Sequence, residues 1–376
     1  MKVCHVISGL TVGGAETMLC SLVDSLSSLK IDQSVAVLGG EGPLSDRVCR
    51  SGAEITHLGM APGRFSAAAL RRLRAWIRER RPDVVHGWMY HANLMTSLAG
   101  IGTRIPVLWA IHQTLYDIGH EKRTTRIVIR ASKALSGMPR QIVYCSAISL
   151  EQHRAFGFRS RSPLLIPNGF DVARFRPDAE ARARVRAELA IGEEEFAIGL
   201  AARWHPMKDH ANFLQAAATF ARDRPRSVFV LAGEGLTWEN ASLAAKVRSL
   251  GLSDRIRLCG RRDDMPAFHS ALDVLSSSSS HGEAFPMMLG EGMACGVPCV
   301  ATDVGDVAGI VGDTGIIVPP RNSTALSEGW ARLADMEASE RRALGLRARQ
   351  RIIENFAQEA VSHRFVQLYR DLAAAS

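Results

Sequence analysis

The chain has 376 residues, of which 47% are hydrophobic and 22% are charged, and this composition excludes a largely disordered protein. The length suits two domains of roughly 150 to 200 residues each. The net charge is +8, with arginines concentrated at residues 71–81 and 122–140, but no aromatic-interleaved basic motif is present, so we expect no nucleic-acid partner.

Short apolar runs alternate with amphipathic helical stretches along the whole chain. The first series comprises strands at 3–7, 34–38, 84–85, 107–111 and 141–145, with helices at 15–29 and 70–80. The second series follows the turn at 167–169 and comprises strands at 197–201, 228–232, 256–259, 274–275, 297–301 and 315–318, with a helix at 211–221. This rhythm is typical of βα units, so it predicts an α/β protein with two doubly wound parallel sheets.

The expected domains are an N-terminal domain at 1–166, a C-terminal domain at 167–346 and a final helical segment at 347–376. The junction is placed near 166–178 because the segment around Pro177 leads from a turn into a charged helical stretch. The final segment is predicted to be a helix that is interrupted near Asn355 and Phe356 and packs back on the N-terminal domain.

The seven cysteines form no Cys-x-x-Cys pair, which argues against a disulfide framework and against a zinc site. No signal-peptide core precedes the first glycine loop, and no run of 18 apolar residues occurs. We therefore expect a cytoplasmic protein. The arginine-rich segments leave two interpretations open: contact with anionic lipid at the inner face of the plasma membrane, or solvated helix faces.

The strongest local signal is the run from His281 to Pro298. Pro286 suits the first turn of a helix and Gly296 suits its C-terminal cap, so Glu283 falls in a loop and Glu291 on the helix. The N-terminus of that helix presents unsatisfied N–H groups, which can bind a diphosphate or another anion. The pattern predicts a pocket with a carboxylate on each side of an anion site.

This arrangement resembles the Glu-x7-Glu motif of the family-four retaining glycosyltransferases. The resemblance implies the GT-B fold, with two Rossmann-like doubly wound domains facing across a deep cleft. It also implies that Glu283 contacts the donor sugar near the reacting centre and that Glu291 holds the ribose hydroxyls. The donor-binding residues expected in this run are Glu283, Ala284, Phe285, Pro286, Met287 and Glu291.

Two cations follow the predicted strand that ends near Ala201. Arg203 and Lys208 fall at the carboxyl edge of a parallel strand, where α/β proteins bind ligands. Fixed cations can neutralise a diphosphate as negative charge develops on it, and the family uses its matching arginine and lysine in this way. We expect both residues to bind the donor and to take part in catalysis. No Asp-x-Asp sequence occurs, so no catalytic metal and no cofactor are expected.

The loop after the first strand contains Gly13 and Gly14, which permit close backbone approach and a positive φ. It resembles the Gly-Gly-Ala-Glu loop of the same family, which implies donor contact, while a structural turn is the alternative. Glu16 is interpreted as a helix-start carboxylate. His112, just beyond the strand at 107–111, matches a family histidine that contacts sugar hydroxyls, and we include it among the catalytic candidates beside the alternative of a structural histidine.

Further along, the resemblance implies that Gly260 and Arg261 meet the nucleobase. The segment 303–311 departs from the family's Gly-Gly-x-x-Glu pattern, because Asp306 stands at the second glycine. His86 and His91 could line the acceptor side, but packing or loop hydrogen bonding is the favoured interpretation for both.

The resulting hypothesis is a retaining, metal-independent hexosyltransferase-type enzyme. Its substrates would be a nucleotide-sugar donor, with UDP-sugar as the family's commonest option, and an oligosaccharide or lipid-linked sugar acceptor in surface polysaccharide synthesis. Two alternatives stay open. One is a nucleotide-sugar 2-epimerase, and the other is a non-catalytic nucleotide-sugar-binding subunit.

Overall fold

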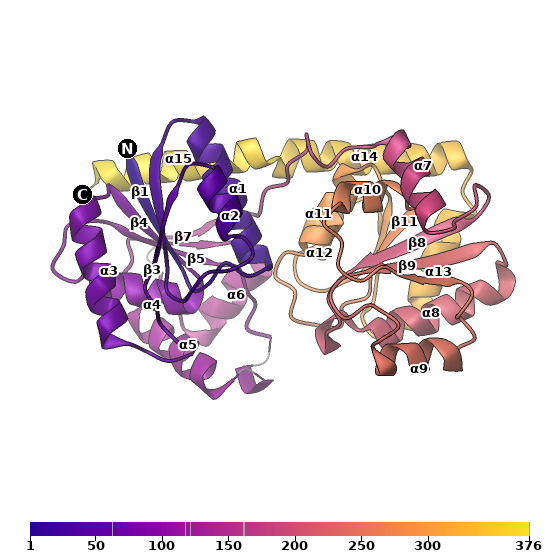
Figure 1. Cartoon of the computed structure of the whole chain (residues 1–376), viewed down its shortest axis with the longest axis horizontal. Coiled ribbons are helices and arrows are strands. Elements are labelled where there is room, and N and C mark those ends of the chain that lie inside the picture. The colour runs from indigo at the N-terminus through magenta and orange to yellow at the C-terminus, as the bar shows by residue number, and fades with distance from the viewer. Residues whose placement is uncertain (62, 117, 121, 161, 376) are drawn as a thin grey trace. The chain divides into compact units, whose positions relative to one another are not determined.

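A computed structural model describes residues 1–61, 63–116, 118–120, 122–160 and 162–375 (Figure 1). The chain divides into two compact units. Unit 1 contains residues 1–169 and 358–376, and unit 2 contains residues 170–357. Within the described ranges, no helix is both long enough and apolar enough to cross a membrane.

Unit 1 is built on a seven-stranded parallel sheet with the order β3-β2-β1-β4-β5-β6-β7. The strands are β1 (Lys2–Ile7), β2 (Asp32–Val37), β3 (Glu54–His57), β4 (Val84–Trp88), β5 (Val107–Ile111), β6 (Gln141–Tyr144) and β7 (Pro163–Leu165). The chain runs outward from β1 through β2 to β3 and then returns to β4 on the other side of β1. The strand order therefore reverses between β1 and β4, which is where doubly wound sheets bind ligands.

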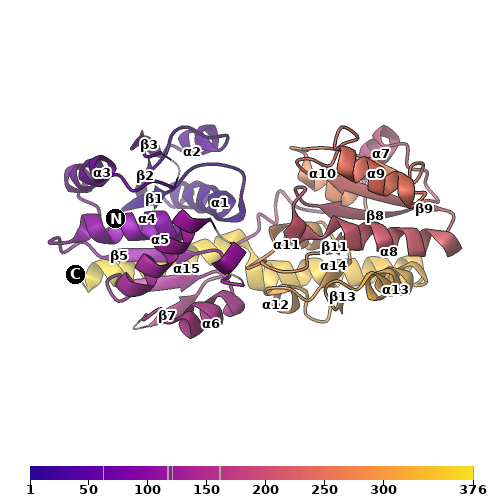
Figure 2. The same ribbon diagram turned by 90° about the horizontal axis from the view of Figure 1, so that it is seen from below.

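Helices cover both faces of this sheet, as the two views in Figures 1 and 2 show. Side chains of β1 alternate between the faces: Val3 and Ile7 belong to the core shared with α1 and α15, whereas Cys4 and Val6 belong to the core shared with α3 and α4. The helices of unit 1 are α1 (Gly14–Ser28), α2 (Ser45–Arg50), α3 (Ala67–Arg80), α4 (Met89–Gly100), α5 (Arg123–Leu135), α6 (Ala147–Phe156) and α15 (Gln358–Ala374), with a 3-10 turn at Ile118–His120.

Helix α15 is far from the rest of unit 1 in sequence but belongs to its core. It packs on α1 and on β4. Burial of one large apolar side chain stabilises a fold by about 1.5–3 kcal/mol. The apolar side chains that α15 buries are Val361, Phe365, Val366, Tyr369 and Leu372. Unit 1 without α15 would therefore lack a substantial part of its hydrophobic stabilisation.

Unit 2 is built on a six-stranded parallel sheet with the order β10-β9-β8-β11-β12-β13. The strands are β8 (Phe196–Ala201), β9 (Ser227–Ala232), β10 (Ile256–Leu258), β11 (Val274–Ser277), β12 (Cys299–Thr302) and β13 (Ile316–Val318). Here the order reverses between β8 and β11. The two doubly wound parallel sheets predicted from the βα rhythm are thus confirmed.

The helices of unit 2 are α7 (Ala179–Glu188), α8 (His210–Asp223), α9 (Ala241–Ser249), α10 (Met265–Ser270), α11 (Met287–Ala294), α12 (Val307–Val311), α13 (Ser323–Ala334) and α14 (Ala338–Phe356), with a 3-10 turn, η2, at Pro206–Lys208. Their apolar faces meet the sheet in a core that contains Phe213, Phe229 and Trp330. Trp330 donates its indole N–H to Ser276 Oγ at 3.0 Å, so the buried polar atom of this large side chain is satisfied.

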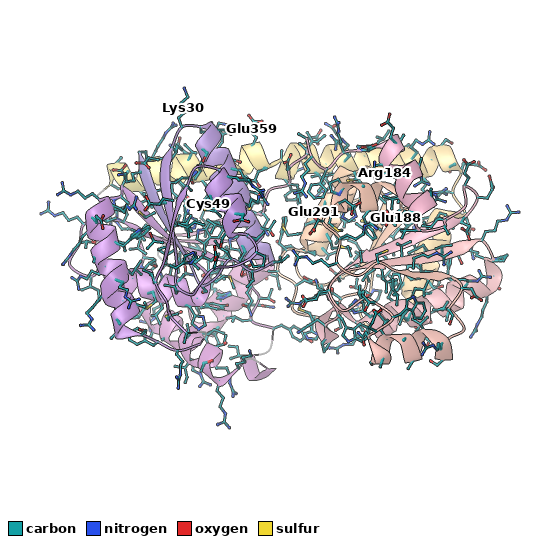
Figure 3. The ribbon with its side chains drawn as sticks, viewed as in Figure 1. Lys30, Cys49, Arg184, Glu188, Glu291 and Glu359 are labelled. Atoms are coloured by element: carbon teal, nitrogen blue, oxygen red, sulfur yellow. The ribbon has the colours of Figure 1, made fainter. Side chains whose placement is uncertain are left out.

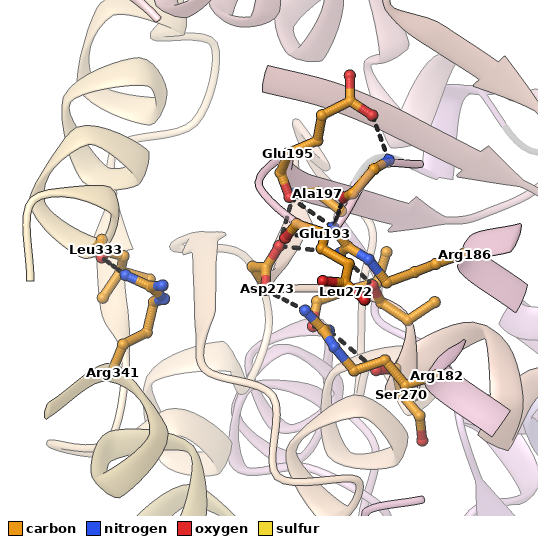
Figure 4. A network of polar contacts seen from close by, with 12 residues as sticks. Arg182, Arg186, Glu193, Glu195, Ala197, Ser270, Leu272, Asp273, Leu333 and Arg341 are labelled. Atoms are coloured by element: carbon orange, nitrogen blue, oxygen red, sulfur yellow. Dashed lines mark hydrogen bonds and ion pairs between the residues drawn. The ribbon is translucent and has the colours of Figure 1, made fainter. Parts of the chain in front are cut away.

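Helix α7 is anchored by a polar network at the amino end of β11 (Figure 4). Asp273 accepts from Arg182 at 2.7 Å, from Arg186 at 3.3 Å and from the Ala197 backbone N–H at 2.8 Å. Arg186 also donates to the carbonyl oxygen of Glu195 at 2.7 Å. One carboxylate thus joins α7 to the beginnings of β8 and β11, at the edge of the sheet opposite the carboxyl ends of the strands.

The chain passes between the units at 169/170 and at 357/358, whereas the sequence analysis expected boundaries at 166/167 and 346/347. The second difference arises because α14 continues to Phe356 with Ile352 fully buried. Arg349, on the same helix, donates to the backbone oxygens of Phe175 at 2.8 Å and Val172 at 3.1 Å. Residues 347–357 therefore belong to unit 2, and the helix breaks only at Ala357, which has an extended conformation.

Both crossing points are joined inside unit 2. The Phe170 N–H donates to the Phe356 carbonyl oxygen at 2.8 Å. The Phe170 ring stacks on Phe285 with the ring centres 5.9 Å apart, and Phe285 lies 5.7 Å from Phe356. We call these three side chains the aromatic cluster. Since Phe285 is in the loop that carries Glu283, the cluster connects that loop with both crossing points.

Candidate functional site

The carboxyl ends of β8 and β11 lie side by side at the point where the sheet of unit 2 reverses its strand order. The loop after β8 carries Lys208, and the loop after β11 carries Glu283. Lys208 Nζ forms an ion pair with Glu283 Oε1, and Ser279 Oγ donates to the same oxygen at 2.6 Å. The lysine and glutamate side chains are 17% and 9% exposed, so the pair is largely shielded from water. Two residues that the sequence analysis singled out separately are thereby brought together.

The serines after β11 hold this loop against its neighbours. Ser278 Oγ donates to the Lys208 carbonyl oxygen at 2.7 Å, and the Ser280 N–H donates to the Met207 carbonyl oxygen at 2.9 Å. On the other side, Thr302 Oγ1 donates to the Ser279 carbonyl oxygen at 2.6 Å. These serines belong to a run of five at residues 276–280. A run of polar residues at the end of a buried strand is the sequence feature that could have indicated this role in ordering the neighbouring backbone.

Two glycines make the close packing of the Glu283 loop possible. Gly282 has φ +77°, and a Cβ there would lie 2.7 Å from Met207 Sδ. Gly305 has φ +69°, and a Cβ there would lie 2.4 Å from the Glu283 carbonyl oxygen. Any other residue would meet both an unfavourable backbone conformation and a steric clash. The position of Glu283 is therefore set by the loops after β8 and β12 as well as by its own.

Helix α11 begins directly after this loop. The sequence analysis predicted Pro286 in the first turn of this helix. In the structure Pro286 is the N-cap residue, and Met287 is the first residue of the helix. Ala284 and Phe285 are each 7% exposed, so they form the packed base of the loop. The Leu289 N–H donates to the Pro286 carbonyl oxygen at 3.2 Å in the first turn. The N-terminus of a helix carries partial positive charge, which makes this end of α11 suited to an anion.

Glu291 lies on α11, as predicted (Figure 3). Its side chain is 18% exposed, and Oε2 is 3.9 Å from Nε2 of His269 on α10. Glu291 also contributes, after burial, to raising the pKa of the Cys295 thiol to about 12. The carboxylate thus sits at the border between solvent and the packed interior of unit 2.

Arg203 and Arg261 are exposed at the same edge of the sheet. The Gly233 N–H donates to the Gly260 carbonyl oxygen at 2.7 Å, and the Trp204 N–H donates to the Glu234 carbonyl oxygen at 2.7 Å, so the loops after β8, β9 and β10 are linked. Arg261 has its guanidinium 3.7 Å from Asp263. The structure therefore keeps Gly260 and Arg261 on the side of β8 away from Glu283.

The loop after β8 carries two cations, Arg203 and Lys208, and one anion, Asp209, and Lys208 is paired with Glu283. Burial lowers the pKa of His205, and the nearby cations Arg203 and Lys208 lower it further. Burial and Lys208 together lower the pKa of His210 to about 4. Both imidazoles are therefore neutral at pH 7, and the positive charge is carried by Arg203 and Lys208. This edge of unit 2 is electrostatically suited to an anionic ligand.

The glycine loop of unit 1 follows β1 at the other reversal point. The expectation of a positive φ is wrong here: Gly13 is an extended N-cap residue with φ −158°, and Gly14 is the first residue of α1. A Cβ at position 13 would lie 2.5 Å from Glu16 Oε2, so a larger residue would displace the end of this flexible side chain. Glu16 accepts from Thr11 Oγ1 at 3.3 Å and lies in the first turn of α1, the position that its interpretation as a helix-start carboxylate predicts.

His112 lies directly after β5 and is held by three contacts. Its Nδ1 is 2.9 Å from Asn168 Oδ1, its ring stacks on Trp88 with centres 5.1 Å apart, and its backbone N–H donates to Met89 Sδ at 3.3 Å. Burial lowers its pKa to about 4, so the ring is neutral at pH 7. With Nδ1 donating to Asn168, Nε2 is left with a lone pair and has no hydrogen-bond partner among the described residues. The sequence analysis noted Asn168 only as a turn residue.

His86 of unit 1 serves packing. His86 is fully buried, and its Nδ1 is 2.8 Å from the Tyr369 hydroxyl, in agreement with the packing role expected for it. Burial lowers the pKa of each buried histidine of this unit. These histidines are His5, His86 and His153, which are fully buried, and His112, which is half-buried. In the part of the chain that the structure describes, no group of three or more His, Cys, Asp or Glu side chains is arranged to hold a metal ion.

Two protein-family models match the chain. The model "Glycosyltransferase Family 4" matches residues 12–174, and the model "Glycosyl transferases group 1" matches residues 181–351. Among curated proteins, putative glycosyltransferase EpsF of Bacillus subtilis (strain 168) is 26% identical over 317 residues, covering 80% of this chain and 79% of EpsF. A D-inositol 3-phosphate glycosyltransferase of Kineococcus radiotolerans is 27% identical over 337 residues, covering 82% of this chain and 76% of that protein.

The fold is also similar to that of solved structures. The crystal structure of Anabaena Alr3699/HepE in complex with UDP superposes with a TM-score of 0.87 and covers 99% of this chain and 100% of that one, at 20% identity. Sucrose-phosphate synthase from Thermosynechococcus elongatus gives a TM-score of 0.83 at 21% identity, with complete coverage of both chains.

Proposed function

We propose that this chain transfers a sugar from a nucleotide-sugar donor to an acceptor hydroxyl. The chain belongs to the glycosyltransferases, with a Family 4 segment followed by a group 1 segment. The observation that carries this proposal is the Lys208–Glu283 pair beside the N-terminus of α11. It combines a cation, an anion-binding helix end and a shielded carboxylate at the reversal point of one sheet.

The donor diphosphate would bind to Lys208, Arg203 and the first-turn N–H groups of α11. Negative charge on the diphosphate grows as its bond to the sugar breaks. Cations fixed at this position therefore stabilise the transition state more than the bound donor. Because these groups are supplied by the protein, the proposed reaction requires no metal ion.

Glu283 would act on the sugar. A sugar carbon that loses its leaving group acquires positive, oxocarbenium-like character, and a shielded carboxylate beside it is stabilising. His112 would accept a hydrogen bond from a sugar hydroxyl through its unprotonated Nε2. Glu291 would hold the ribose hydroxyls, and Gly260 and Arg261 would lie beside the base. For the stereochemical course we propose retention, with the acceptor attacking from the face that the leaving group departs.

UDP is the nucleotide proposed first. It is the ligand in the HepE structures, which hold UDP or UDP-glucose, and their fold matches over nearly the whole chain. The proposed acceptor is a lipid-linked oligosaccharide, in line with the similarity of the fold to that of WaaB, a lipopolysaccharide outer core galactosyltransferase (TM-score 0.69, 16% identity). Such an acceptor would require the protein to work at a membrane surface on its cytoplasmic side.

Helix α5 supports membrane contact. Ile127 on this helix is 64% exposed, and it is flanked by exposed Arg123 and Arg130. The loop carrying Phe65, which is 63% exposed, lies against Thr124 at the start of the same helix. Apolar side chains surrounded by arginines fit the interface of an anionic bilayer.

Sedimentation with vesicles tests this contact. The protein is expected to bind phosphatidylglycerol vesicles and not phosphatidylcholine vesicles. Because one basic residue near the surface contributes about 1 kcal/mol, Arg130→Glu is expected to weaken binding at least about five-fold. Arg248→Glu, on exposed α9, is the control. Equal binding of both vesicle types, or no difference between the variants, would contradict membrane contact through α5.

Nucleotide titration tests the donor site. Thermal shift and calorimetry with UDP, other nucleoside diphosphates and UDP-sugars, without added metal, should show one preferred nucleotide. Lys208→Ala and Glu291→Ala are expected to weaken binding by at least about ten-fold, since each removes a charge-assisted contact. Lys246→Ala and Glu328→Ala, both exposed in unit 2, are the matched controls. Binding that is the same in all four variants would refute the assigned site.

Product analysis then tests the reaction. With the preferred donor and a lipid-linked acceptor, the new linkage should keep the anomeric configuration of the donor in its NMR spectrum. Inversion would refute retention. Formation of an epimerised nucleotide sugar without acceptor would identify an epimerase instead. Donor binding with neither transfer nor hydrolysis would identify a non-catalytic subunit.

A further inference from the structure

His269 is a fully buried polar side chain without a hydrogen bond. It lies on α10, its ring is 0% exposed, and neither Nδ1 nor Nε2 has a hydrogen-bond partner among the described residues. A neutral imidazole carries one N–H, and a buried donor without an acceptor is destabilising. Such a group in a native fold calls for an explanation.

The two ring nitrogens face two consecutive residues of α11. Nε2 is 3.9 Å from Glu291 Oε2, slightly too far for a hydrogen bond. Nδ1 is on the side of Gly292, where a Cβ would lie only 3.2 Å away. Two apolar rings also lie near it: the Phe268 and Phe175 rings have centres 5.5 and 6.3 Å from the imidazole. The Glu291 carboxylate is thus the acceptor that faces this donor, and a shift of about 1 Å would bring the two into hydrogen-bonding distance.

We propose that His269 is a positioning residue for Glu291: it donates Nε2–H to Oε2 when a ribonucleotide binds, and so turns the other carboxylate oxygen toward the ribose hydroxyls. This inference rests on the proposed function, which places the ribose at Glu291. A carboxylate that must accept from a ribose diol has several rotamers available at an 18% exposed site. A donor fixed in the interior selects one of these rotamers. Part of the rotamer entropy of Glu291 is then lost when the protein folds, and nucleotide binding costs less entropy.

The inference predicts a specific pattern of nucleotide affinity. His269→Phe keeps the ring volume but removes the donor, so it should weaken UDP binding about ten-fold. Its affinity for 2′,3′-dideoxy-UDP should equal that of the wild type, because that nucleotide has no diol to place. His269→Phe should also keep or raise the unfolding midpoint, since an unpaired buried polar group is replaced by an apolar one. A purely structural histidine would show the opposite: a lower midpoint and equal losses for both nucleotides.

A double-mutant cycle completes the test. Calorimetric Kd values for UDP and 2′,3′-dideoxy-UDP are measured for the wild type, His269→Phe, Glu291→Gln and the double variant. The double variant should bind UDP no more weakly than Glu291→Gln alone, because the histidine acts only through the glutamate. His269→Gln, which keeps an N–H donor, should restore most of the discrimination, and it supplies the test if the phenylalanine variant does not fold.

The possible results are distinguishable. If the wild type binds no nucleotide, the proposed function fails and this inference fails with it. If the wild type distinguishes UDP from the dideoxy nucleotide and Glu291→Gln does not, the donor site stands. In that case, full discrimination by His269→Phe, or additive losses in the double variant, would overturn the role of His269 alone.

Discussion

Replacing Gly290 by alanine tests how tightly the aromatic cluster fixes α11. In an open helix this substitution is favourable by about 1 kcal/mol, because alanine has the higher helix propensity. At position 290, however, the new Cβ would lie 2.0 Å from Phe170 Cζ and 2.3 Å from Cε2. Carbon atoms pack at about 3.5–4.0 Å, so the ring must move by roughly 1.5 Å. Phe170 is 1% exposed and stacked on Phe285, which leaves little room for that movement.

The cost of such overpacking is about 1–3 kcal/mol and exceeds the propensity gain over most of that range. With the propensity gain subtracted, we expect Gly290→Ala to destabilise unit 2 by up to about 2 kcal/mol, which lowers its melting temperature by up to about 8 °C. Calorimetric melting and guanidinium titration followed by tryptophan fluorescence measure the effect. Since the displaced ring supports the Glu283 loop, UDP affinity should also fall.

Gly309→Ala is the matched control, because this helical glycine in α12 has no atom within 4 Å of the added Cβ. It should leave the midpoint unchanged or raise it. Phe170→Leu in the Gly290→Ala background should recover part of the loss, because the smaller side chain relieves the overlap. A Gly290→Ala protein as stable as the wild type would show that the cluster yields easily, and the rigidity argued for this loop would be refuted.

Three further predictions concern other parts of the molecule. Between pH 6.5 and about 4, each buried histidine of unit 1 should reduce stability by about 1 kcal/mol per pH unit, because its folded pKa is lowered and only the unfolded chain takes up the proton. Denaturant midpoints at pH 7, 6 and 5 measure this slope, and a flat profile would contradict it. Asp273→Asn should destabilise unit 2 by about 2–3 kcal/mol, because it weakens a shielded Arg–carboxylate network. The Kd for UDP should not change, because the network is far from the carboxyl ends of the strands. A changed Kd with an unchanged unfolding midpoint would show that the network and the donor site are not independent. Ser279→Ala should lower kcat about ten-fold with a smaller effect on donor Kd, because it removes one hydrogen bond to Glu283; equal kcat would show that Lys208 alone orients the carboxylate.

The sequence predicted the fold well because a parallel α/β architecture is encoded locally. Strand-length apolar runs such as 228–232 and the helix-start and helix-end residues around α11 are visible in one dimension. The positions of Lys208 and Glu283 at strand ends followed from the same rhythm. The sequence could predict that both residues lie at the same edge of the sheet. It could not predict that their strands are neighbours, because the order of strands in a sheet is a tertiary property.

The remaining features depend on contacts between distant segments. Gly13 was expected to need a positive φ, but its backbone is extended. The end of unit 2 at Ala357 depends on the burial of Ile352 and on the carbonyl oxygens that Arg349 meets, neither of which is local. His269 gives no sequence signal at all, since a lone histidine on a short helix acquires significance only beside Glu291.

The composition of unit 1 from two separate segments has a consequence for biosynthesis. A ribosome delivers residues 1–169 first, then the whole of unit 2, and only at the end the helix α15. Unit 2 is continuous and can fold as soon as it emerges, whereas the first 169 residues must wait with the α15-facing surfaces of α1 and β4 uncovered. The part of the protein that is synthesised first is therefore the part that is completed last. During that interval its exposed apolar surface is the site where the nascent chain is most open to aggregation and to chaperones.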